Sequence, residues 1–188
     1  MFDRVQTGFS DSKLFLAHQY LPLEQEEFYL DQMQEQLTAY LLKCQQLNLN
    51  ERQRQQVNVM LAVVTELEAL SDDCLTIVVY LKRMEEKKLN IASEDKKRLL
   101  PYIELARQLL YFVHRHIGSE LNKEQLAFAN SLEEQIDEER TVLKKVARER
   151  LEQGSDVKAE LLYIDIVRKV EKMGDSCFAI ARQLGGRG

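Results

Sequence analysis

The stretch DVKAELLYIDIVRKVEKMGDSCFAIARQL, residues 156–184, decides the fold class of this protein. Apolar side chains lie three residues apart in it at Leu161, Ile164 and Val167, and Phe178 lies about three helical turns further along the same face. This spacing places the side chains on one face of an α-helix, and no strand-like alternation competes with it. We therefore predict one long amphipathic helix for this stretch.

The same periodicity extends over most of the chain. It predicts four further helices, at residues 24–47, 51–89, 94–117 and 123–152. The predicted N-caps are Asn50, Ser93, Asn122 and Ser155, and Pro22 is expected to close an irregular N-terminal segment. Because the links between helices are short, neighbouring helices must run antiparallel, so the predicted fold is an elongated all-α bundle.

Composition excludes several classes of protein. With only 7 glycines and 2 prolines among 188 residues, the chain lacks the frequent turns of a β-sandwich or barrel. The net charge of −5 argues against nucleic acid as a partner. No apolar run approaches the roughly 18 residues of a membrane span. The 3 cysteines are odd in number and widely spaced, which is typical of thiols in a reducing cytoplasm.

Acidic residues interrupt the apolar spacing of two predicted helices. In the helix at 156–184 the spacing continues onto Glu171 and Asp175, and in the helix at 51–89 it continues onto Glu68 and Asp72. A cysteine follows two positions after each Asp, which indicates an internal repeat. A carboxylate removed from water without a partner costs several kcal/mol, so we expect a cation beside each pair.

Two further acidic pairs are predicted to face these. Counted back from the turn between their helices, Glu27 and Asp31 lie level with Glu68 and Asp72. We call these four residues the first acidic cluster. Glu133, Asp137, Glu171 and Asp175 form the second acidic cluster in the same way. Carboxylates on facing helices of a bundle are a known route to a metal site, and oxygen donors suit Fe, Zn, Mn or Mg.

The alternative interpretation is that both clusters are ordinary surface charges. Arg168 and Lys172 lie close enough along the helix to neutralise the Glu171 and Asp175 carboxylates. The matching depth of the two clusters in their hairpins favours metal binding. If metal binds, we expect the second cluster to bind it more tightly, because Gly174 has no side chain to crowd the site.

The segment YIDIVRKVEKMGDSCFAIA, residues 163–181, resembles the signature helix of PhoU domains, and VEKMGD at 170–175 carries the match. LEALSD at 67–72 is a weaker copy, and EEQID at 133–137 is similar to the other acidic motif of that family. Residues 146–165 are similar to the soluble C-terminal part of bacterial Na+/phosphate cotransporters. The resemblance covers residues 24–184.

This resemblance implies two pseudo-repeated three-helix bundles. The expected division is an N-terminal segment or linker at 1–22, a first repeat at 23–92, a second repeat at 93–184 and a flexible tail at 185–188. Some members of the family carry multinuclear iron or zinc on their acidic motifs, so the resemblance implies metal ligands at Glu68 and Asp72, at Glu171 and Asp175, and at Glu133 and Asp137. Glu27 and Asp31 are candidate ligands from their facing position alone. The chain departs from the family pattern in having Ala179 in place of Asn, and in a first helix that is missing or reduced to residues 1–20.

The function expected from the resemblance is regulation rather than catalysis. The chain would be a cytoplasmic domain of a Na+/phosphate cotransporter-type protein, located at the inner face of the membrane, and would modulate phosphate transport. Two alternatives stay open: a free-standing PhoU-type regulator of phosphate uptake signalling, and a metal-free helical adapter or scaffold. Expected partners are a membrane transporter domain or a phosphate-signalling protein, and a second copy of the chain through the apolar residues at 14–23.

Overall fold

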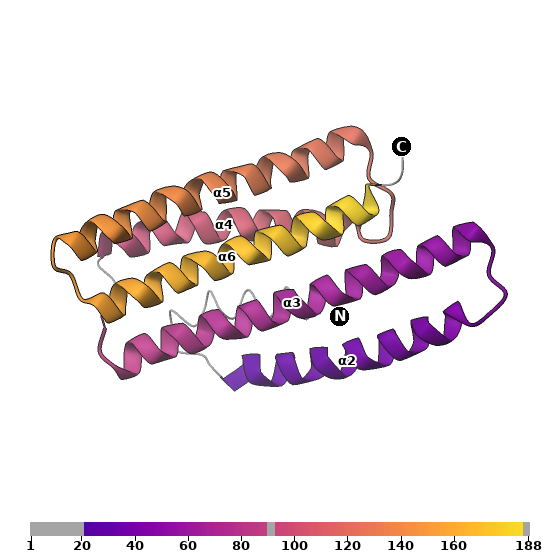
Figure 1. Ribbon diagram of the computed structural model, residues 1–188, viewed down its shortest axis with the longest axis horizontal. Helices are drawn as coiled ribbons and strands as arrows, with labels where there is room; N and C mark the ends of the chain where they lie inside the picture. The colour runs from indigo at the N-terminus through magenta and orange to yellow at the C-terminus, as the bar shows by residue number, and fades with distance from the viewer. Residues whose placement is uncertain (1–20, 90–92, 186–188) are drawn as a thin grey trace.

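The computed structural model describes residues 21–89 and 93–185, and these ranges consist of helices and the turns that connect them (Figure 1). The helices are α2 (Leu21–Gln45), α3 (Glu51–Glu86), α4 (Ser93–His116), α5 (Lys123–Glu152) and α6 (Val157–Leu184). Their bounds lie within about three residues of the predicted ones. The prediction of an elongated all-α bundle of antiparallel helices is confirmed.

Reciprocal capping boxes begin α3 and α5. The Asn50 side chain accepts a hydrogen bond from the backbone N–H of Gln53 at 2.9 Å, and the Gln53 side chain accepts one from the Asn50 N–H at 3.0 Å. Asn122 and Gln125 form the same pair at 2.8 and 2.9 Å. Each box satisfies backbone donors that the first helical turn leaves without partners. Both predicted Asn caps are therefore confirmed.

The other helix starts differ from the prediction. Asp156 rather than Ser155 caps α6, and its side chain accepts from the backbone N–H three residues on, at 2.9 Å. Ser93 is the first helical residue of α4 rather than its cap. Pro22 lies in the first turn of α2, which begins at Leu21, instead of closing an irregular segment. The fixed φ of proline and its missing N–H suit that first turn.

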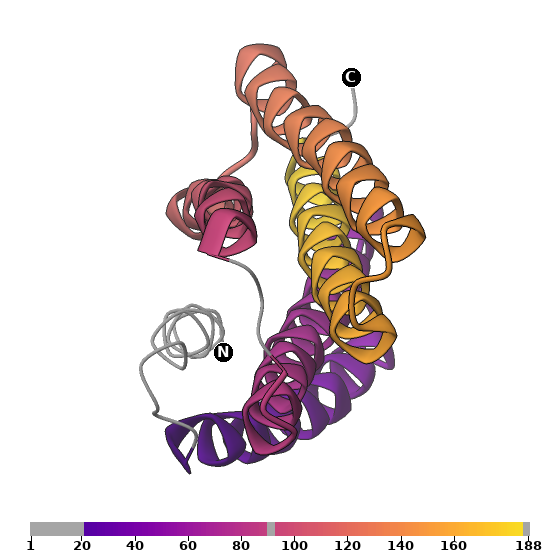
Figure 2. The ribbon, with the colours of Figure 1, turned by 90° about the vertical axis from the view of Figure 1, so that its left-hand side faces the viewer.

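α6 is the central helix of the molecule. It packs against α3, α4 and α5, and α4 also packs against α5, so α4, α5 and α6 form a three-helix bundle. Seen end-on, α2, α3, α6 and α5 follow one another in a curved row, with α4 on one side of it (Figure 2). The Tyr102 hydroxyl of α4 donates to the backbone carbonyl of Val167 in α6 at 3.0 Å, which fixes these two helices against each other.

α2 packs against α3 alone among the described helices. Leu30 and Leu41 are its buried contacts with that neighbour. Phe28, Tyr29, Leu37 and Tyr40 remain exposed along α2, with Tyr40 at 65%. The side chains predicted to mediate self-association, in residues 14–23, lie outside those that the structure describes.

The acidic pairs lie beside the core and not within it, which corrects their predicted position on a core-facing stripe. Leu161, which anchored that stripe, is 52% exposed, whereas Ile166 and Val170 are fully buried. Asp175 of α6 and Asp72 of α3 are exposed, whereas the Glu171 side chain, at the edge of the core, is 14% exposed. Because α6 packs on three helices, its apolar residues cover overlapping stripes, and the predicted stripe runs along their edge, from the exposed Leu161 to the fully buried Val167.

Candidate functional site

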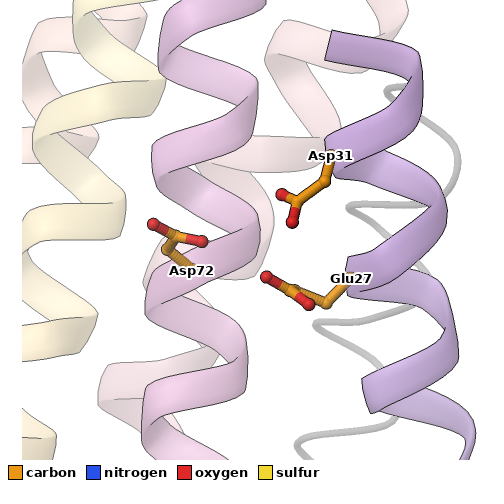
Figure 3. Close-up of side chains that lie close together, drawn as sticks. All are labelled: Glu27, Asp31 and Asp72. Atoms are coloured by element: carbon orange, nitrogen blue, oxygen red, sulfur yellow. The ribbon is translucent and has the colours of Figure 1, made fainter. Parts of the chain in front are cut away.

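The first acidic cluster is formed where α2 faces α3. Glu27 and Asp31 project from α2 toward α3, which carries Asp72 (Figure 3). One carboxylate oxygen from each of these three side chains lies within 4.8 Å of the other two. Within residues 21–89 and 93–185 no other group of three potential ligands is this close. The predicted convergence of the two helices at this depth is therefore present in the fold.

Glu68 completes the first cluster electrostatically. Burial raises the pKa of its carboxyl, and the negative charges of Asp72 and Asp31 raise it further. The pKa of Asp72 is raised by burial first, then by Asp31 and Asp73, while Lys169 opposes the shift. Like charges close together make ionisation unfavourable, and a bound cation would reverse that penalty. The donors are carboxylate oxygens, a set that fits hard divalent cations.

The second acidic cluster contains its own cations. Arg140 of α5 donates a hydrogen bond to Glu171 of α6 and lies 3.7 Å from Asp137. Lys144, one turn further along α5, lies 3.8 Å from the other oxygen of Glu171. Of the two cations that the alternative interpretation offered, Arg168 pairs instead with Asp165 at 3.1 Å, whereas Lys172 does lower the pKa of Asp175.

The remaining carboxylates of the second cluster are only partly compensated. Burial raises the pKa of Asp175, Glu171 and Asp137 raise it further, and the cations Arg140 and Lys172 lower it. The pKa of Glu133 is raised in the same way, by burial and then by Asp137 and Asp175. The four carboxylates therefore influence one another's pKa values, but among the described residues no three of them bring oxygens within 4.8 Å of one another, and the Arg140 guanidinium contacts two of them, Glu171 and Asp137.

Gly174 does not open space at the second cluster. A β-carbon at this position would lie 3.0 Å from the Ile136 Cδ1 atom and 3.2 Å from its Cγ2 atom. The glycine therefore allows α6 to approach α5 closely on the buried side. This removes the reason given above for expecting the second cluster to bind metal more tightly.

A polar cavity of about 530 Å³ separates the two clusters, between α3 and α6. Asp72 of the first cluster and Asp175 of the second both line it. Lys169 donates to Asp73 across this interface, and the two side chains are only 19% and 10% exposed. A buried ion pair of this kind fixes how the facing helices align, because removing either partner leaves an unpaired buried charge.

Sequence reasoning missed Arg140, Lys144, Asp73 and Lys169. A signal for the first two is present, since residues 133, 137, 140 and 144 follow the three-to-four spacing of one face of α5. Two acids and two bases therefore share that face. For Asp73 and Lys169 the sequence offers no such signal, because their pairing depends on the axial register of helices distant in the chain.

Comparisons of this chain with protein-family models, with curated proteins and with solved structures found no match. In the part of the chain that the structure describes, none of the helices has a stretch apolar and long enough to cross a bilayer. The fold and the clusters described above therefore carry the functional argument.

Proposed function

We propose that this chain is a PhoU-like regulatory domain, without enzymatic activity, that modulates phosphate transport by a Na+/phosphate cotransporter-type protein at the cytoplasmic face of the membrane. The observation that carries the proposal is the convergence of Glu27, Asp31 and Asp72 between α2 and α3. Asp72 belongs to the weaker copy of the PhoU-like motif, and its approach to acidic residues of the facing helix supports the proposal. A divalent cation is the ligand that this donor set favours.

The electrostatics of the cluster support a regulatory role for the cation. Without metal, the carboxylates repel one another across the α2–α3 interface, as the raised pKa values of Glu68 and Asp72 indicate. With a divalent cation bound, Glu27, Asp31 and Asp72 would each be attracted to the same charge, and this would hold α2 against α3. A ligand that binds one arrangement of two helices more tightly increases the population of that arrangement. A partner protein that binds this arrangement preferentially is then regulated by the ligand.

Metal titration of the purified chain tests the cation site. In Mn²⁺, Fe²⁺ or Zn²⁺ the melting temperature should rise, and a chelator should reverse the rise. Binding to the folded state alone stabilises it by about 2.7 kcal/mol at a hundredfold excess over the dissociation constant. The double variant Asp31→Asn, Asp72→Asn should lose the response. Glu138→Gln, Glu139→Gln is the matched control, because these two exposed residues of α5 lie outside both clusters.

Phosphate uptake tests the physiological part of the proposal. Cells that carry Asp31→Asn, Asp72→Asn in the chromosomal copy should show altered uptake of radiolabelled phosphate, whereas the control pair should not. Unchanged uptake with intact metal binding would separate the cation site from phosphate transport. No metal response at all would leave the adapter function as the better account.

A specific observation favours that second candidate, a metal-free helical adapter. An apolar groove of about 830 Å³ is formed by α2, α3, the turn that follows α4 and the C-terminal end of α6. Leu37, Tyr40, Met60, Ile117 and Leu184 are among its lining residues. A groove of this kind suits an apolar helix of a partner. An adapter that works through it would bind its partner equally well in metal and in chelator.

A further inference from the structure

The two acidic clusters differ in what neutralises them. In the second cluster the Arg140 side chain, 28% exposed, lies between the two helices and contacts carboxylates on both, Glu171 of α6 and Asp137 of α5. Lys144 adds a second positive charge 3.8 Å from Glu171. In the first cluster Lys169 lowers the pKa of Asp72 without contacting it as closely as Asp73, to which its ammonium group is bound.

A guanidinium in this position competes directly with a metal ion. It presents several N–H donors to carboxylate oxygens, and its positive charge does not depend on pH in the physiological range. A metal ion would need the same oxygens of Glu171, which is only 14% exposed and is held by Arg140 and Lys144. Metal binding would therefore require the guanidinium to move away from Glu171. Because Arg140 is tethered to α5, its positive charge would remain close enough to repel the ion.

We infer that Arg140 is the resident cation of the second cluster, so that this cluster takes no metal ion, in contrast to what the resemblance to PhoU domains implies. The inference deepens the proposed function and rests on it in assigning cation binding to the first cluster. It makes the two halves of the chain unequal: the α2–α3 hairpin responds to divalent cations, and the α5–α6 hairpin stays closed without them.

Mn²⁺ binding, followed by calorimetry and by the paramagnetic resonance signal of the free ion, tests the inference. In the full chain carrying Asp31→Asn and Asp72→Asn, no binding should remain. Adding Arg140→Gln should create a Mn²⁺ site there, at least about tenfold tighter than any residual binding before that change. Adding Arg140→Lys instead should not, because it keeps the positive charge. Circular dichroism confirms that each variant is folded.

Two results would overturn the inference. One is specific Mn²⁺ binding by the Asp31→Asn, Asp72→Asn chain that is lost on Glu171→Gln, a measurement that needs no change at Arg140. The other is a folded Arg140→Gln variant that gains no Mn²⁺ site. These results differ from those expected if the first cluster is not a cation site. In that case the wild-type chain would bind no Mn²⁺, whereas Arg140→Gln alone would still create a site at the second cluster.

Discussion

Replacing Asp31 by Asn should stabilise the metal-free protein, whereas most single substitutions destabilise a protein. The amide keeps the volume of the side chain and removes one negative charge from the first acidic cluster. Asp31 lies within 4.8 Å of Glu27 and Asp72, measured between carboxylate oxygens. Its charge also raises the pKa of Glu68. Each of these interactions is repulsive and disappears in the variant.

The magnitude follows from Coulomb's law. Two unit charges 4.8 Å apart repel by about 0.9 kcal/mol at the dielectric constant of water, which is the appropriate limit because Asp31 is exposed. Salt at physiological strength reduces this by roughly half. Summed over its neighbours, the variant should gain about 1 kcal/mol, which corresponds to about 2–4 °C in melting temperature for a chain of this size.

Thermal melts in chelator and in Mn²⁺ check the reasoning, with Glu138→Gln as a control for the same change in net charge. In chelator, Asp31→Asn should melt above both wild type and the control. In Mn²⁺ the order of wild type and Asp31→Asn should reverse, because the wild-type protein keeps all its ligands and gains more from the ion. If Asp31→Asn and Glu138→Gln melt together in chelator, the carboxylates do not repel as described.

Three further outcomes are expected. Because the pKa values of Glu68 and Asp72 are raised in the folded state, the repulsion is present at neutral pH and is relieved as pH falls toward the ordinary carboxylate range of about 4. The advantage of Asp31→Asn in chelator should therefore shrink in urea titrations as the pH falls from about 7 toward this range, and Mn²⁺ binding should weaken with it. Gly174→Ala should destabilise by about 1 kcal/mol, since crowding against Ile136 exceeds the gain in helix propensity; an unchanged urea midpoint would show that the side chain moves aside. Lys169→Met should cost about 3–5 kcal/mol by leaving Asp73 unpaired, and the double change with Asp73→Leu should recover most of it.

The helices were predictable because their signals are local. Apolar spacing and the Asn50 and Asn122 caps act within a few residues, so the sequence alone placed all five described helices. The depth of the acidic pairs was also predictable, because short turns fix how far along each hairpin two residues meet. The facing of Glu27 and Asp31 toward Asp72 followed from that count.

Helix rotation could not be predicted in the same way. α6 carries apolar residues on several faces. The spacing of these residues therefore does not show whether the buried face contains Ile166 and Val170 or the exposed Leu161. The counter-charge of the second cluster was partly misassigned for a related reason. Arg168 is close to Glu171 in sequence, but Arg140 reaches it from the neighbouring helix. Contacts between helices depend on rotation and register together.

The Lys169–Asp73 contact joins residues 96 positions apart, and this has a consequence for the order in which the chain folds. The α2–α3 and α5–α6 hairpins close short loops and can form early, whereas docking α3 on α6 must bring together distant parts of the chain. That docking step should therefore be the slow one. Cys74 and Cys177, both 1% exposed, lie on these two helices. Their thiols should remain accessible to a pulse of alkylating reagent until the two hairpins dock. The extent of alkylation at each time of refolding would therefore report the rate of the last folding step.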